Sequence, residues 1–447
     1  MQWSRYSTLF ESKRNGWLLF NTISRSLMVV KPEQLDTIRG IMADPEGYDY
    51  SRAVKLYMQL RAMGFLVEDG KDDEFYNIHK MRTLAFLYGN RSLMLTFALS
   101  MACNFDCSYC YESSHVGHVM TQETEDKVMR FIRKFRADKL YITWYGGEPL
   151  LAFDRILSMN RRFQDMGKNY EAAMITNGYL LTRDKADKLN DLRVNYLQIT
   201  LDGSRETHNS RRYLKGGGAT YDRILENIDG VMASDFRGTV YVRVNVDGRN
   251  DEEFAEVYKM IRDKYPKDFG SRITVYPGFV KGDAHPDRGC FFDPVQQGEF
   301  ISRMVEKYDI APYSPFPQRK MQGCILTRRN AYVVGPDGEM YKCWDDVGMP
   351  EKVVGTVDRF EDWNMGLIAE GMTACSYLDS PECKACFYFP ICDGGCHRIR
   401  QNNLHTDHPQ SSCSWFRGNL ENLLELHYES RKKQAAAQKQ QAGGDKA

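Results

Sequence analysis

The feature that most constrains this sequence is the placement of its twelve cysteines. None precedes residue 103, three fall within residues 103–110, and nine lie between Cys290 and Cys413. In a reducing compartment such clusters indicate metal sites and not disulfides. The first residues are interrupted by charges and lack the apolar core of a signal peptide, and no run of about 18 apolar residues occurs. We therefore expect a cytoplasmic protein that binds metal and has no membrane span.

The composition is that of a globular protein, with 42% hydrophobic and 27% charged residues. A length of 447 residues predicts roughly three domains. Sixty basic residues balance sixty acidic ones, so a generally basic surface for nucleic acid is not indicated. We expect neither a nucleic acid nor a membrane as a partner.

The middle of the chain, residues 91–282, alternates strand patterns with helix patterns. Strands are predicted at 93–99, 140–143, 172–175, 197–201, 239–246 and 273–276, and helices at 121–136, 153–166, 183–192, 221–233 and 252–264. Six successive βα units predict an α/β fold with a partial (β/α)6, TIM-like barrel. The active site of such a barrel lies at the carboxyl ends of its strands.

Residues 1–90 predict a separate, winged-helix-like domain. Two apolar runs, 16–21 and 27–30, are joined by a polar turn and predict a hairpin. Helical patterns follow at 34–42 and 51–63, and then a short strand at 65–67. Such a module either packs against the rest of the protein or docks a peptide along an exposed strand edge.

The C-terminal part divides by composition into three segments. Five prolines mark residues 283–322 as a linker. Residues 323–415 are rich in cysteine and poor in periodicity, as in a fold held together by metals. Residues 416–447 predict a helix from 417 to about 431, followed by a disordered, low-complexity tail.

The first cysteine motif, Cys103-x3-Cys107-x2-Cys110, comes directly after the first predicted barrel strand. Three thiolates satisfy three irons of a [4Fe–4S] cluster and leave the fourth iron open for a small ligand with an amine and a carboxylate. A structural zinc site needs four ligands, so three cysteines alone would serve zinc poorly. The motif therefore favours an iron–sulfur site at the mouth of the barrel.

In this context the motif resembles that of the radical SAM superfamily, over about residues 93–280. The resemblance implies that a cluster on the three cysteines binds S-adenosylmethionine (SAM). One electron, from a donor such as flavodoxin or ferredoxin, then cleaves SAM to a 5′-deoxyadenosyl radical. The segment Tyr145-Gly146-Gly147-Glu148-Pro149 after the second strand matches the family's GGEP, which binds the SAM amino group.

The resemblance also implies further SAM contacts. Thr176 and Asn177 close the third strand as in the family, and Thr200 at the end of the fourth is expected near the SAM ribose or carboxylate. Arg212 ends a segment, His208–Arg212, that matches the family's HDxxR with Asn209 in place of Asp; it would pair with the SAM carboxylate. Tyr109 is expected near the adenine. A surface ion pair for Arg212 and a plain core role for Tyr109 are the competing interpretations.

The later cysteines resemble the seven-cysteine SPASM domain, which holds two auxiliary [4Fe–4S] clusters and brings the implied total to three. By motif position the outer cluster is bound by Cys383, Cys386, Cys392 and Cys413, and the inner one by Cys324, Cys343 and Cys396. The inner cluster then lacks one ligand, which either Cys290 or Cys375 supplies unless the site is open to substrate. Zinc remains the competing metal for these Cx2C-type pairs.

SPASM proteins act mostly on peptides, and the resemblance therefore implies a peptide oxidoreductase. We expect it to modify oxidatively, as by cross-linking, a ribosomally made precursor peptide that docks on residues 1–90 and enters the barrel. One alternative is anaerobic sulfatase maturation, the oxidation of Ser or Cys to formylglycine. Those enzymes carry Asp directly after the second SPASM cysteine, where this chain has Trp344, and they usually lack a 90-residue leading domain. The other alternative is a zinc-stabilised, peptide-binding protein.

Three carboxylates are candidates for the catalytic base on position alone. Asp202 lies at the barrel mouth, and Asp345 and Asp346 follow the second SPASM cysteine. A solvated turn carboxylate is the competing interpretation for each.

Overall fold

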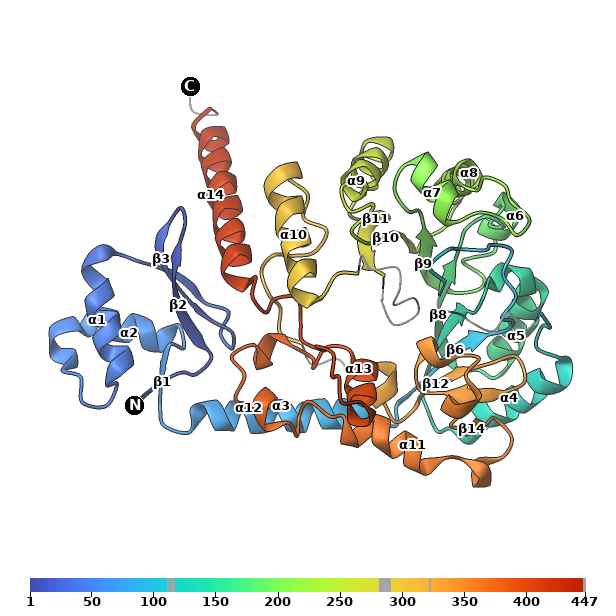
Figure 1. Cartoon of the computed structure of the whole chain (residues 1–447), viewed down its shortest axis with the longest axis horizontal. Coiled ribbons are helices and arrows are strands. Elements are labelled where there is room, and N and C mark those ends of the chain that lie inside the picture. The colour runs from blue at the N-terminus through green and yellow to red at the C-terminus, as the bar shows by residue number, and fades with distance from the viewer. Residues whose placement is uncertain (111, 113–116, 281–290, 321–322, 445–447) are drawn as a thin grey trace. The chain divides into compact units, whose positions relative to one another are not determined.

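The computed structural model describes residues 1–110, 112, 117–280, 291–320 and 323–444, with side chains through residue 436. The chain forms two compact units (Figure 1). The barrel unit comprises Leu87–Phe292 and Cys324–Cys375, and the terminal unit comprises Met1–Phe86, Asp293–Gly323 and Ser376–Ala447. Across the described residues, none of the helices combines the length and the apolar character needed to cross a bilayer.

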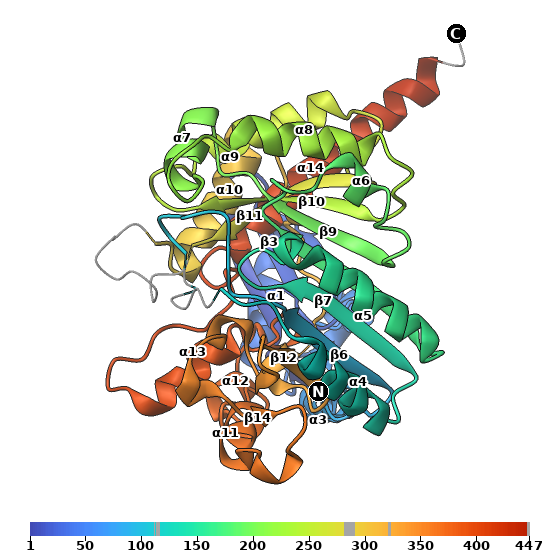
Figure 2. The same ribbon diagram turned by 90° about the vertical axis from the view of Figure 1, so that its right-hand side faces the viewer.

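Six parallel strands form the centre of the barrel unit, and all six lie where the sequence predicts them. They are β6 (Ser92–Ala98), β7 (Lys139–Tyr145), β8 (Asn169–Thr176), β9 (Val194–Thr200), β10 (Thr239–Val246) and β11 (Ile273–Phe279). The predicted helices are present as α4 (Gln122–Lys134), α5 (Phe153–Asp165), α6 (Arg183–Ala186), α8 (Tyr221–Met232) and α9 (Glu253–Lys264), and α7 (Arg205–Arg211) is additional. Figure 2 shows these helices along one face of the curved sheet. The α/β partial barrel is confirmed.

Alternation along the strands explains why the helices cover one face only. In β7, Leu140, Ile142 and Trp144 are buried, whereas the residues between them are partly exposed. The buried set packs on the helices: the Trp144 ring lies 6.2 Å from that of Phe163 in α5. The opposite face is left to line the interior of the barrel.

The sheet continues past β6 with three strands that the sequence analysis does not predict. Strand β12 (Ala331–Val334) pairs in parallel with β6, and β13 (Glu339–Tyr341) and β14 (Gly355–Thr356) follow in antiparallel order. The β12–β13 turn is formed by Pro336-Asp337-Gly338, with φ of +84° at Gly338. The expectation of little regular structure in residues 323–415 was therefore wrong for the part up to Thr356.

The terminal unit begins with the predicted hairpin, β3 (Gly16–Asn21) with β4 (Leu27–Val30). Strand β2 (Ser7–Ser12) completes a three-stranded antiparallel sheet, and β1 (Gln2–Trp3) pairs with β5 (Leu66–Val67). Helices α1 (Pro32–Ala43) and α2 (Val54–Ala62) share a core with this sheet, and α3 (Lys71–Leu87) follows. Among the described residues β4 pairs only with β3, so its outer edge is open to a further strand.

Two expectations for the C-terminal part need correction. Helix α10 (Pro294–Tyr308) occupies the supposed linker, because Asp293 and Gln296 form a capping box and Pro294 takes the first helical position. Helix α14 (Leu420–Gly444) continues through the supposed disordered tail, whose Ala, Gln and Lys residues are good helix formers. It lies beside β2, where the Lys13 amide donates to Glu425 at 3.0 Å (Figure 1).

A buried histidine gives the terminal unit a testable pH dependence. The His79 ring lies 4.8 Å from that of Phe389, and burial together with the nearby Arg319 charge lowers the pKa of His79 from 6.5 to about 4. The unfolded chain therefore binds a proton that the folded one excludes as the pH falls from about 6.5 to about 4. We expect this residue to remove about 3 kcal/mol of stability over that window.

Thermal unfolding of wild type, His79→Phe and His408→Gln between pH 4 and pH 7.5 checks this. His79→Phe should flatten the loss of stability below pH 6.5, while His408→Gln, at an exposed position, should follow the wild type. An unaltered pH profile for His79→Phe would contradict the assignment.

Candidate active site at the mouth of the barrel

The loop with the first three cysteines follows β6 and pairs with the segment after α7. The amide of Asp106 donates to the Tyr213 carbonyl at 2.9 Å, and that of Ser108 donates to the Arg211 carbonyl at 3.0 Å. Burial raises the pKa of the Cys103 thiol to about 12 and that of Cys110 to about 11. Thiols in such surroundings keep their protons unless a metal cation takes the proton's place.

The Gly146–Gly147 pair is the support on which this loop rests. The amide of Gly147 donates to the Ser100 carbonyl at 3.2 Å, and that of Glu148 donates to the Ala102 carbonyl at 2.9 Å. A Cβ at position 147 would lie 2.3 Å from the Ala102 oxygen, and one at position 146, where φ is +114°, 2.5 Å from the Ser100 oxygen. Only glycine permits this approach of two backbones.

Glu148 binds the ends of two strands together. Its carboxylate is buried and accepts hydrogen bonds from the Thr176 hydroxyl at 2.6 Å, the Asn177 amide at 2.7 Å and the Leu150 amide at 3.0 Å. Burial raises the pKa of Glu148, and these donors oppose that shift. The side chain is therefore held by β7, β8 and the turn that starts at Pro149, and it fixes the site's geometry from within.

Asn177 connects the end of β8 with the cysteine loop. Its side-chain amide donates to the Asn104 side-chain carbonyl at 2.8 Å, and its own carbonyl oxygen accepts from the Tyr179 amide at 2.9 Å. Thr200 is buried at the end of β9. The predicted SAM-binding segments thus converge on one edge of the sheet, next to the three cysteines.

A second buried network centres on Tyr109. Its hydroxyl donates to the Asp202 carboxylate and accepts from Arg212 Nη1 at 2.7 Å and from Asn245 Nδ2 at 2.9 Å. The other Asp202 oxygen accepts from the Asn245 amide at 2.8 Å. The guanidinium of Arg211 lies over the Tyr109 ring, 4.9 Å from its centroid. Burial raises the pKa of Tyr109, which keeps its proton and acts as the hub of the network.

Two donors beside the cysteines fit a bound anionic or sulfur-containing group. Arg212 Nε and Asn104 Nδ2 are buried, and neither has a hydrogen-bond partner within the described ranges. Buried donors of this kind cost stability unless a ligand accepts from them. A [4Fe–4S] cluster with SAM offers sulfide, thiolate and carboxylate acceptors, so the residues present fit that group.

The three carboxylates proposed as bases are buried, so the solvated-turn interpretation is wrong. Asp202 is fully buried and accepts from Tyr109 and Asn245. Asp345 and Asp346 lie in the short helix η6 (Trp344–Asp346) after Cys343, and both are buried. Trp344 stacks on Tyr145 at the end of β7, with ring centroids 5.9 Å apart. Burial and the Asp345 charge raise the pKa of that tyrosine.

The later cysteines are divided between the two units. Cys324, Cys343 and Cys375 belong to the barrel unit, and Cys383, Cys386, Cys392, Cys396 and Cys413 belong to the terminal unit. Cys290 lies outside the described residues. In the ranges that the structure describes, no group of three or more His, Cys, Asp or Glu side chains is arranged to bind a single metal ion.

Within the terminal unit the outer-cluster cysteines influence one another. Burial raises the pKa of Cys386, and the charges of Cys383 and Cys413 add to that effect. Two arginines donate directly to sulfur: Arg400 Nη2 to Cys383 and Arg417 Nη1 to Cys413, each at 3.0 Å. These donors suit thiolates more than neutral thiols.

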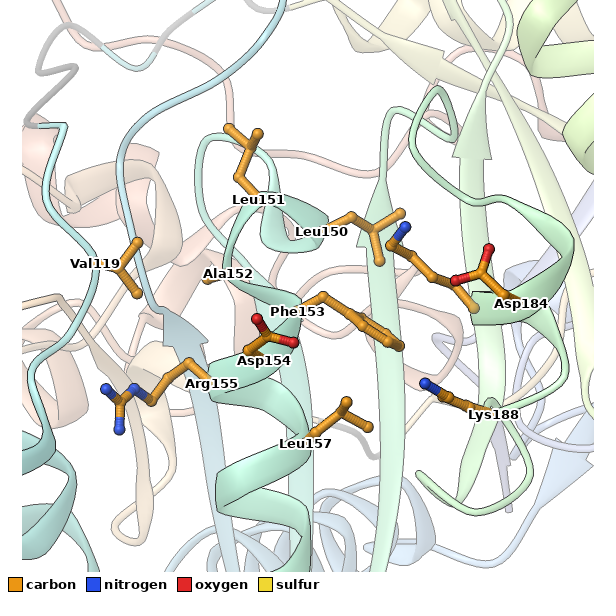
Figure 3. A pocket seen from close by; sticks show the side chains of 11 residues that line it. Val119, Leu150, Leu151, Ala152, Phe153, Asp154, Arg155, Leu157, Asp184 and Lys188 are labelled. Carbon is orange, nitrogen blue, oxygen red and sulfur yellow. The ribbon is translucent and has the colours of Figure 1, made fainter.

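Several residues of the site escaped the sequence analysis, among them Asn104, Arg211, Asn245 and Asp247. Asn245 is the penultimate residue of the fifth barrel strand, β10, and Asp247 follows that strand; this position was their only signal. The pocket of about 560 Å³ in Figure 3 is a different place, because η2 (Pro149–Ala152), α5 and the α6 region line it, with none of the cysteines.

Comparison with known proteins agrees with this geometry. The sequence profile of the Radical SAM superfamily matches residues 98–261, which begin at the end of β6 and run into α9. The chain contains a radical SAM domain. The family implies a [4Fe–4S] cluster and SAM, and the matched residues include Cys103, Cys107 and Cys110.

The curated relatives differ in how much of this chain they match. The AdoMet-dependent heme synthase of Methanosarcina barkeri is 27% identical, over 39% of this chain and only 48% of its own length. The cysteine-type anaerobic sulfatase-maturating enzyme of Clostridium perfringens is 22% identical, over 69% of this chain and 89% of its own. The antilisterial bacteriocin subtilosin biosynthesis protein AlbA of Bacillus subtilis is 24% identical, over 75% and 73%.

Two solved structures share the fold. Native anSMEcpe with bound AdoMet and Cp18Cys peptide has a TM-score of 0.57 and 19% identity, and the match covers 77% of this chain and 99% of that one. Streptococcus suis SuiB bound to precursor peptide SuiA has a TM-score of 0.51 and 13% identity, and the match covers 92% and 98%.

The glycine contact gives a prediction for the radical SAM domain. Gly147→Ala places a methyl group against the Ala102 carbonyl and should displace the cysteine loop, with loss of most of the cluster that the loop binds. Gly230→Ala in α8 is the matched control, because nothing lies within 4 Å of its added Cβ. Iron content and the electron paramagnetic resonance (EPR) spectrum after anaerobic reconstitution measure the difference. Equal loading of the two variants would show that the contact is dispensable.

Proposed function

We propose that this enzyme cleaves SAM reductively and uses the radical to oxidise, by cross-linking, side chains of a ribosomally made precursor peptide. The observation that carries the proposal is the loop of Cys103, Cys107 and Cys110 at the carboxyl ends of parallel strands, beside two buried donors that have no partner among the residues the structure describes. Maturases of peptides or proteins are among the relatives that match most of this chain. When bound, the cluster and SAM supply one-electron cleavage of the sulfonium and hence a carbon-centred radical.

The chain's own residues position and enclose the reactants. Cys103, Cys107 and Cys110 would hold the cluster, the Gly146–Pro149 backbone the SAM amino group, and Arg212 the SAM carboxylate. Glu148 and Tyr109 are positioning residues, since their polar atoms are already bound within the protein. Buried contacts of this kind keep a site rigid and dry, which hydrogen abstraction requires.

The inner face of the barrel would receive the peptide core. Tyr196 and Tyr241 stack there with centroids 4.2 Å apart, and Tyr276 donates to Gln198 at 2.5 Å. Arg243 lies across Gly278, where a Cβ would be 2.1 Å from its Nε. Aromatic faces bind peptide side chains, and a guanidinium binds carbonyl oxygens. Both groups lose little conformational entropy when they do so.

Asp345 and Asp346 remain the base candidates, and Asp202 does not, because its oxygens are taken by Tyr109 and Asn245. A base beside Cys343 is placed to remove a proton as the substrate radical is oxidised. The auxiliary clusters that would take up the electron are assigned to the later cysteines, with Arg400 and Arg417 supporting the outer one. A flavodoxin or ferredoxin would supply the first electron.

Formylglycine formation is the second candidate function. The matched sulfatase maturase is covered over 89% of its length, and Asp345 lies two positions after Cys343. A cross-link and the oxidation of Ser to formylglycine both remove two hydrogens, so fragmentation of the product peptide and its reaction with a hydrazide separate the two reactions. A cross-link removes two hydrogens and joins two residues, whereas formylglycine formation converts one Ser or Cys to an aldehyde. A zinc-stabilised binding protein would contain zinc and make neither product.

The cysteine loop supplies the decisive test of the radical chemistry. Cys103→Ala/Cys107→Ala/Cys110→Ala should form no 5′-deoxyadenosine from SAM and dithionite, because three of the four irons lose their ligands. Cys290→Ala, outside the motif, is the control and should retain the activity. Chromatographic detection of 5′-deoxyadenosine in the triple variant would refute the assignment.

The outer edge of β4 is the proposed docking place of the precursor peptide. The Asn21 amide donates to the Ser26 carbonyl, so the register turns the amides of Leu27 and Val29 away from β3. An extended peptide that adds to this edge would accept from those amides.

Val29→Pro removes one of these donors, whereas Val29→Ala shortens the side chain and keeps it. With a fluorescently labelled short peptide taken from a neighbouring open reading frame, we expect at least tenfold weaker binding for Val29→Pro and less than threefold for Val29→Ala, measured by fluorescence anisotropy. SAM cleavage without peptide should survive in both. Equal peptide affinities of the two variants would contradict docking at the edge of β4.

A further inference from the structure

Three cysteines of the barrel unit share one small apolar cluster. Cys343, Cys375 and Leu326 are buried in it, and Cys324 packs against them. Only Cys324 and Cys343 belong to the seven-cysteine pattern, and Cys375 has no place in that pattern. Cys375 therefore places a third thiol beside two expected ligands, and the proposed function gives this thiol no role.

The three thiols come from three separate pieces of chain. Cys324 precedes the short helix η5 (Ile325–Thr327), and Cys343 lies between β13 and η6. Cys375 ends a π-helical turn, η9 (Glu370–Ala374), that continues α11 (Met365–Ala369). Long-range folding, and not sequence proximity, therefore brings Cys375 to the other two.

The surroundings suit thiolates bound to a metal. Cys343 and Cys375 are each 5% exposed, so their sulfurs are largely shielded from water. The buried Lys342 donates to the Arg328 and Ala331 carbonyls at 2.5 and 2.8 Å, which ties the segment of Cys343 to the loop that follows Cys324. The Cys375 sulfur contacts the Gly371 carbonyl at 3.0 Å, as a protonated thiol would. Iron replaces such protons and removes the repulsion between thiolates.

We propose that Cys375 is a ligand of the inner auxiliary [4Fe–4S] cluster, together with Cys324 and Cys343. It supplies the ligand that the seven-cysteine pattern lacks, in preference to Cys290 and to a site left open for substrate. The inference rests on the proposed function insofar as that function includes auxiliary clusters. It does not depend on which peptide is modified or on how.

The competing role for Cys375 is that of a small buried hydrophobe, and electron paramagnetic resonance with iron analysis separates the two roles. The test starts from the Cys103→Ala/Cys107→Ala/Cys110→Ala chain, anaerobically reconstituted with iron and sulfide, which should hold about eight irons in two clusters. Three thiolates can still hold a [4Fe–4S] cluster, so adding Cys375→Ala should leave one iron of the inner cluster without its protein ligand and shift one of the two EPR signals. Adding Cys290→Ala should leave both signals unchanged. Cys375→Val, which keeps the apolar cluster filled, should shift the same signal as Cys375→Ala does.

Each other outcome counts against the inference. An EPR spectrum in Cys375→Ala that is identical to that of the parent chain, with about eight irons retained, overturns it, and so does a changed or lost signal in Cys290→Ala instead. If the Ala and Val variants fail to fold, by circular dichroism, Cys375→Ser keeps the size of the side chain, and an unchanged EPR spectrum in it is then the overturning result. A parent chain without iron overturns the auxiliary-cluster assignment as a whole. Formation of 5′-deoxyadenosine by the wild type tests the SAM chemistry separately.

Discussion

The site depends on one close contact between two backbones. Where β7 ends, Gly146 and Gly147 lie against the carbonyls of Ser100 and Ala102, at distances that leave no space for a Cβ. This contact fixes the start of the cysteine loop to the end of the neighbouring strand before any metal binds. An iron–sulfur cluster tolerates little displacement of its thiolates, so a loop held by backbone contact is a better support than one held by side chains.

The same logic explains why several charged residues of the motifs are buried and fully bonded. Glu148 accepts two hydrogen bonds from the end of β8 and one from the Leu150 amide in η2, and Asp202 accepts from Tyr109 and Asn245. A carboxylate that accepts from fixed donors inside a protein has a defined orientation and gives its neighbours one. A residue of this kind serves catalysis by holding others in place.

The predictable and unpredictable parts of this fold differ in the range of the interactions that form them. The six barrel strands, from Leu93 onward, are visible in the sequence because alternation and βα order are local signals. Strand β12 pairs with β6 across more than 200 residues of chain. Its local signal in the sequence is the Pro336-Asp337-Gly338 turn that follows it. Helix α10 was missed because Pro294 was taken as a sign of a linker, whereas proline is also common at the first position of a helix.

The site shows the same division. Motif spacing indicated the cysteines, the glycines and Arg212, but not the partners that hold them. Asn104 is a variable position of the cysteine motif, and Asn245 comes from β10 and belongs to no motif. Spacing also suggested that residues 323–415 act as one domain, whereas β12 draws Cys324–Cys375 into the barrel unit. Tyr76 and His79 pack on Phe389 in the terminal unit, together with Cys383. The cysteines of one seven-cysteine pattern thus belong to two compact units, a division that spacing along the chain cannot reveal.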